Sequence, residues 1–159
     1  SLVFMLVACA DDHGETTDPA CGYSEVGAMI VIATSDMSTE PTAEVHFMDH
    51  GHKVQLEAGA GGYVWFEVPA DAEGEVGIYI QSEDAVETFY HEGNEVDLNA
   101  PVVHPDCGDI FPVFYDMTGM AEGTWHIKLK DVAEASEVWI MAMPMNGDAS
   151  HDDHGHHEH

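Results

Sequence analysis

Gly61-Gly62-Tyr63-Val64-Trp65-Phe66-Glu67-Val68-Pro69 is a short alternating stretch of the chain. Val64, Phe66 and Val68 share one side of an extended backbone, and the residues between them point to the other side. The glycines before this stretch and the proline after it are typical of the loops that flank a strand. The stretch therefore predicts a β-strand with one buried face.

Other segments with alternating or continuous apolar side chains predict further strands at residues 26–33, 45–47, 53–56, 76–80, 86–90, 110–115, 125–129 and 138–142. No stretch shows a sustained period of 3.6 residues, so we expect no helices that connect parallel strands. We predict an all-β fold for residues 22–145, consisting of one antiparallel β-sandwich. Immunoglobulin-like, jelly-roll and small-barrel arrangements all remain open.

Two of these segments predict a hairpin. A turn at His50-Gly51 would pair Phe47 with Val54 and Val45 with Leu56, so that both pairs are apolar.

Two further positions follow from the same patterns. Residues 26–33 are apolar almost throughout, which predicts a central strand. His126 is predicted to point outward with Lys128 and Lys130, because both of its chain neighbours are apolar.

The even positions of the hairpin carry four candidate metal ligands, His46, Met48, His50 and His52. His46 and Met48 are expected on its outer face, and His50 and His52 at its tip. Residues two apart on a strand lie about 6.5–7 Å apart, so imidazoles at that spacing can converge on one ion. His46 and His52 would meet only if the turn folded back. An inert surface histidine is the alternative for each position.

Residues 151–159 read His-Asp-Asp-His-Gly-His-His-Glu-His and contain no apolar side chain. Such a composition predicts that residues 146–159 form a disordered tail. Neutral imidazole suits zinc and copper, and carboxylates can complete the coordination shell. The candidate ligands of the tail are His151, His154, His156, His157 and His159. The alternative is a solubilising acidic tail.

Met141, Met143 and Met145 form a second set of alternating side chains. Thioether is a soft ligand that selects Cu(I), whereas methionine also fills gaps in apolar cores. Histidine and methionine ligands on a β-sandwich are similar in type to those of periplasmic copper chaperones. The spacing and order here depart from that family's pattern, so no residue is assigned from it.

The chain has 31 acidic side chains against three basic ones, and its formal net charge is −28. Nucleic acids and anionic membrane surfaces are excluded as electrostatic partners, because both need a basic patch. The acidic surface attracts cations, and it is equally typical of proteins from saline habitats. The sequence contains no Gly-x-Ser-x-Gly, His-Glu-x-x-His, P-loop or Cys-x-x-Cys motif, and we predict no enzymatic activity.

An apolar run at residues 2–8 is followed by a cysteine, and Leu6-Val7-Ala8-Cys9 resembles the lipobox of bacterial lipoproteins. The resemblance implies that residues 1–8 are the remnant of a signal peptide and that Cys9 is lipidated. The small polar residues that follow predict a flexible tether over residues 9–21. The protein is then exported and lipid-anchored in the bacterial cell envelope. Ala10 in place of Asp favours the outer membrane.

With Cys9 lipidated, Cys21 and Cys107 remain, and an even pair in an exported protein predicts a disulfide. Closing a loop of roughly 85 residues would contribute about 4–5 kcal/mol by chain entropy. The alternative is a metal thiolate at Cys107 with His104. The residues after Cys107 depart from the blue-copper pattern, since no histidine follows until His126.

These features together predict an envelope lipoprotein that binds or buffers a zinc or copper ion. A metal transporter or receptor of the envelope is the expected partner for delivery. The alternative is an acidic structural or interaction lipoprotein of a salt-adapted bacterium without a specific metal role.

Overall fold

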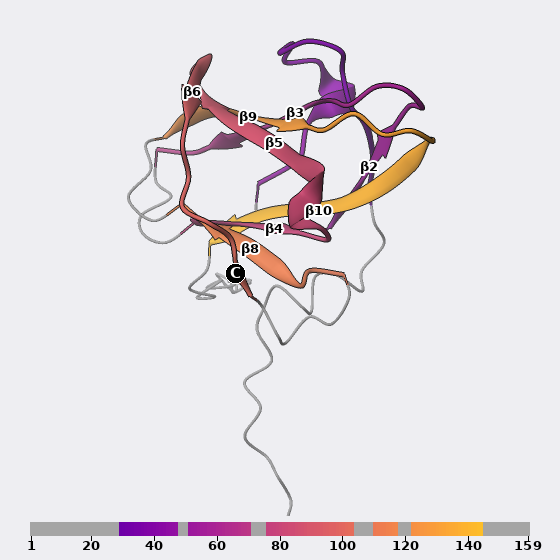
Figure 1. Ribbon diagram of the computed structural model, residues 1–159. Helices are drawn as coiled ribbons and strands as arrows, with labels where there is room; N and C mark the ends of the chain where they lie inside the picture. Colours follow the sequence, from indigo (N-terminus) through magenta and orange to yellow (C-terminus); the bar gives the residue numbers. More distant parts are fainter. Residues whose placement is uncertain (1–28, 48–50, 71–75, 104–109, 118–121, 145–159) are drawn as a thin grey trace, which may run out of the picture.

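The computed structural model describes residues 29–47, 51–70, 76–103, 110–117 and 122–144, which form ten strands and two short 3-10 helices. The strands make two sheets that lie face to face (Figure 1). No helix in these ranges is both long and apolar enough to cross a membrane. The predicted all-β sandwich is confirmed, and the predicted tether and tail lie outside the described residues.

The larger sheet contains six strands in the order β1 (Met29–Ile32), β2 (His52–Leu56), β10 (Ser136–Pro144), β4 (Val76–Ile80), β8 (Val113–Asp116) and β7 (Val102–Val103). Its pairs are antiparallel except β1 and β2, which run parallel. The smaller sheet contains β3 (Gly62–Val68), β9 (Gly123–Leu129), β5 (Val86–His91) and β6 (Asn94–Val96), all antiparallel. The 3-10 helices are η1 (Pro41–Ala43) and η2 (Glu83–Ala85).

Alternation along β3 and β9 builds the core between the sheets. Val64 and Phe66 on β3 and Ile127 on β9 are fully buried and belong to one apolar cluster. The ring of Phe66 stacks on that of Trp125, with centroids 6.4 Å apart and an interplanar angle of 10°. Burial of each such side chain stabilises the fold by roughly 1.5–3 kcal/mol. The predicted strand with Val64, Phe66 and Val68 therefore has the predicted buried face.

The predicted hairpin is wrong. Val54 on β2 pairs with Val31 on β1 and with Val138 on β10, so both edges of β2 are occupied. The backbone N–H of Val45 instead donates to the carbonyl of Trp65 on β3, at 2.8 Å. Val45 is fully buried in that position. The chain forms these longer-range pairings, which occupy both edges of β2, in place of the local hairpin.

The predicted central strand at residues 26–33 is also wrong in its placement. Within the described residues it is the edge strand β1, and residues 26–28 lie outside them. Val31 is 3% exposed and faces the core, whereas Ile30 is 65% and Ile32 is 50% exposed. Apolar residues on both faces of a strand are typical of a central strand. In the described residues, however, other side chains cover only one face of β1.

A second, smaller apolar cluster explains the continuous apolar character of β4 and β10. Its buried members are Tyr79, Phe111, Met141 and Met143, and the side chains packed against them are Ile110, Phe114 and Trp139. Tyr79, Met141 and Met143 occupy positions that alternate with the main core residues Ile78 and Ile140. The cluster therefore covers the outer side of β4 and β10.

Candidate metal centre

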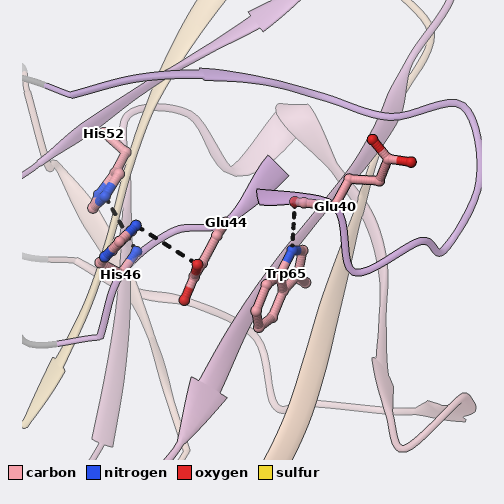
Figure 2. A network of polar contacts seen from close by, with 5 residues as sticks. All are labelled: Glu40, Glu44, His46, His52 and Trp65. Atoms are coloured by element: carbon pink, nitrogen blue, oxygen red, sulfur yellow. Dashed lines mark hydrogen bonds and ion pairs between the residues drawn. The ribbon is translucent and has the colours of Figure 1, made fainter. Parts of the chain in front are cut away.

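His46 lies next to His52, the first residue of β2, although residues 45–47 do not pair with β2 as a hairpin. Their rings are stacked, with centroids 5.8 Å apart and an interplanar angle of 13°. The backbone N–H of His46 donates to Nε2 of His52 at 3.2 Å (Figure 2). Nε2 of His52 therefore acts as the acceptor, which places the proton of the neutral ring on Nδ1. His52 is fully buried and holds the backbone of His46 in place.

Glu44 supplies a carboxylate next to the exposed imidazole. Its Oε2 lies 3.7 Å from Nε2 of His46, and the side chains are 28% and 45% exposed (Figure 2). Both residues belong to the extended segment that follows η1, where Glu44 forms a parallel bridge with Trp65. Glu44 and His46 are two positions apart, so an extended backbone turns both side chains to the same side.

This arrangement offers two donor groups rather than a complete coordination shell. Lone pairs of imidazole nitrogens lie in the ring plane, so two nearly parallel rings do not aim at one ion. Nε2 of His52 already accepts a hydrogen bond, which leaves His46 and Glu44 as the accessible donors. In the part of the chain that the structure describes, no group of three or more His, Cys, Asp or Glu side chains is arranged to hold a metal.

The structure therefore brings together two of the sequence-predicted ligands, His46 and His52, and assigns them different roles. The predicted ligands Met48 and His50 lie outside the described residues, as do His151, His154, His156, His157 and His159. The predicted lipidation site Cys9, the predicted disulfide partners Cys21 and Cys107, and His104 also lie outside them.

The remaining candidate ligands are buried or contact other parts of the protein. Met141 is fully buried and Met143 is 6% exposed, both within the second apolar cluster, so these thioethers fill a core; Met145 lies outside the described residues. His91 stacks on Trp125 with centroids 4.5 Å apart, and its Nε2 lies 2.9 Å from the carbonyl oxygen of Glu122. His126 is on the outer side of β9 as predicted, yet it is only 5% exposed.

Sequence reasoning missed Glu44. The signal was available, because Glu44 precedes His46 by two residues and continues the series of even positions. Acidic residues are so frequent in this chain that nothing in the sequence singles this one out.

Comparison with known proteins adds no assignment: no protein family matches the chain, and no curated protein matches it.

Proposed function

We propose that this protein is a lipid-anchored protein of the bacterial cell envelope that binds or buffers a zinc or copper ion. The observation that carries the proposal is the exposed imidazole of His46 beside the carboxylate of Glu44. The buried His52 stacks on the ring of His46 and accepts a hydrogen bond from its backbone. The histidines of residues 151–159 supply further ligands, and the lipobox resemblance supplies the location.

The chemistry of these groups suits a borderline divalent ion. A neutral imidazole and a carboxylate are common zinc ligands, and a carboxylate near a ligating histidine increases the basicity of the ring. With a formal net charge of −28, the protein raises the local concentration of cations around itself. Delivery to an envelope transporter or receptor is the corresponding role for the bound ion.

The test is a calorimetric titration of the full chain with Zn²⁺ and, under reducing conditions, Cu⁺. Two variants separate the two sets of ligands: His46→Ala, and a variant in which the five histidines of residues 151–159 are serine. We expect each variant to bind at least about tenfold more weakly than the wild type, which corresponds to about 1.4 kcal/mol. His91→Ala is the matched control, because it removes an imidazole on β5 and should leave binding unchanged.

A dissociation constant no tighter than millimolar for all forms of the protein would refute metal binding. Equal affinity of wild type and His46→Ala would instead remove the folded domain from the site and leave only the tail.

A second candidate function is supported by the edges of the larger sheet. Ile30 and Ile32 on β1 and Val103 on β7 are 65%, 50% and 73% exposed. Exposed apolar residues on edge strands are typical of sheets that add a strand from another chain. An acidic interaction protein of this kind needs no specific metal.

Thermal melting distinguishes the two functions. A metal-binding protein should melt at a lower temperature after EDTA treatment and recover with added zinc or copper. The melting temperature of an acidic interaction protein should not change with EDTA. It should rise by several degrees in molar salt, because salt screens the repulsion between the carboxylates. A melting temperature that responds only to salt would favour the second function.

A further inference from the structure

The outer face of the smaller sheet carries three aromatic side chains around a histidine. Tyr63 and Trp65 come from β3, Tyr90 comes from β5, and His126 lies between them on the central strand β9. In the sheet register His126 is directly opposite both Trp65 and Tyr90, and Tyr63 is opposite Lys128. We call Tyr63, Trp65, Tyr90 and His126 the aromatic platform.

The three rings of Tyr63, Trp65 and Tyr90 are half-buried. Nε1 of Trp65 donates to the carbonyl of Glu40 at 3.0 Å (Figure 2). Tyr63 and Tyr90 contact each other with centroids 6.2 Å apart. When the outer face of an antiparallel sheet contacts only water, its residues are mostly polar. Three adjacent aromatic rings on such a face therefore need an explanation.

His126 supplies an independent sign of a ligand. It is 5% exposed, and neither Nδ1 nor Nε2 has a hydrogen-bond partner among the described residues. A neutral imidazole has one donor and one acceptor, and burying both unsatisfied costs about 1–3 kcal/mol for each group. A hydroxyl group is both a donor and an acceptor, and it can satisfy either nitrogen once a flanking ring rotates.

The basic residue next to Tyr63 on this face is paired with a carboxylate. Two of the three basic residues of the chain, Lys128 and Lys130, lie on or directly after β9. Nζ of Lys128 pairs with Oε1 of Glu87 at 2.9 Å and lies 6.0 Å from the ring centroid of Tyr63. This ammonium already occupies the position over Tyr63 that a cationic ligand would take. The platform therefore fits a neutral ligand better than a cation.

A cavity of about 360 Å³ extends the platform beyond Tyr63 and Lys128. Its volume falls within the range of roughly 300–1,000 Å³ for ligand pockets. The polar side chains in its lining include Ser35, Glu57 and Asp131. Oδ1 of Asp131 accepts from the N–H of Gly61 at 2.8 Å, which fixes this wall of the cavity.

We propose that the aromatic platform and this cavity bind a neutral oligosaccharide. The apolar C–H faces of sugar rings stack on Tyr63, Trp65 and Tyr90, while hydroxyl groups reach His126 and the polar side chains of the cavity. Carboxylates accept hydrogen bonds from hydroxyls, and the Lys128 ammonium donates to them. This binding is separate from the proposed metal binding and does not depend on it.

The test is a titration of the full chain with a panel of neutral oligosaccharides derived from glucans, mannans and chitin. Binding is measured by calorimetry and by tryptophan fluorescence, with EDTA present so that metal plays no part. We expect at least one saccharide to bind and to change the emission of Trp65. Trp65→Ala and Tyr90→Leu should each weaken its binding at least about tenfold.

Two control variants make this result specific. Tyr90→Phe keeps the ring and should retain binding, whereas Tyr90→Leu keeps apolar bulk without a ring. Trp139→Phe changes a tryptophan of the larger sheet and should bind as the wild type does. Far-ultraviolet circular dichroism and the melting temperature confirm that each variant is folded, and if Trp65→Ala fails to fold the Tyr90 pair decides.

The proposal is overturned if no saccharide of the panel binds at 10 mM, on the order of the weakest binding that calorimetry resolves. It is equally overturned if Tyr90→Leu binds as tightly as Tyr90→Phe, or if tetramethylammonium, tested in parallel, binds at the platform where the saccharides do not.

Discussion

At the residue scale, the histidines of this chain have distinct surroundings that their spacing in the sequence does not reveal. His46 is accessible and lies beside Glu44, whereas His52 is buried and accepts a hydrogen bond from the backbone. His52 begins β2 of the larger sheet, whereas His46 belongs to a segment that is bridged to β3 of the smaller sheet. The two histidines therefore meet through the tertiary fold. No local period predicts such a contact.

His126 gives a prediction for the pH dependence of stability. Burial lowers the pKa of His126 below its ordinary value, and the nearby carboxylate of Glu92 opposes this shift. The unfolded chain therefore takes up this proton at a higher pH than the folded protein does. The contribution to stability is full above the ordinary pKa of about 6.5 and is lost as the pH falls below it. Urea unfolding at pH 8 and pH 5 measures this loss.

His126→Phe keeps a ring in the same place and removes the titration. We expect the free energy of unfolding of the wild type to fall more steeply than that of the variant between pH 7 and pH 5. Parallel pH profiles for the two proteins would show that His126 is hydrated and not buried as described.

At the element scale, the strands that the sequence predicts well are those with one clear buried face. The predicted segments 53–56 and 64–68 correspond to β2 and β3, in which buried residues alternate with more exposed ones. The two short strands β6 and β7, of three and two residues, are not predicted because an alternating pattern needs more positions. The pairing of β1 with β2 is parallel and non-local, and sequence patterns carry little information on such partners.

The placement of β1 gives a prediction on stability. Val31 faces the core opposite Val54, whereas Ile30 next to it is 65% exposed. Val31→Ala should lower the free energy of unfolding by about 1–3 kcal/mol, because it leaves a cavity. Ile30→Ala should change it by less than about 0.5 kcal/mol. Chemical denaturation of both variants checks this, and the reverse order of effects would mean that β1 turns its other face to the core.

At the scale of the whole molecule, the fold class followed from the sequence, whereas the arrangement of the site did not. Alternation of apolar residues and the lack of a helical period were enough to predict two packed sheets. The candidate centre depends on the separate placement of residue 46 beside β3 and residue 52 on β2, and its carboxylate comes from a residue type that is abundant everywhere in the chain. The platform on β3, β5 and β9 likewise depends on strand order, since it combines residues from three strands.

The negative charge of the molecule affects how metal binding at the proposed site is recognised. A formal net charge of −28 draws cations of every kind toward the surface, so weak binding of metals is expected even without a specific site. A specific site is recognised by stoichiometry and by its dependence on neutral imidazole, which makes binding weaken as the pH falls.

The metal content of the protein purified from its native host, without a metal-affinity column, tests the proposed function most directly. Elemental analysis by mass spectrometry after exhaustive dialysis should find zinc or copper at close to one ion or more per chain, and clearly less in His46→Ala. Native protein that carries only traces of both metals, with the same content in the variant, would contradict the account.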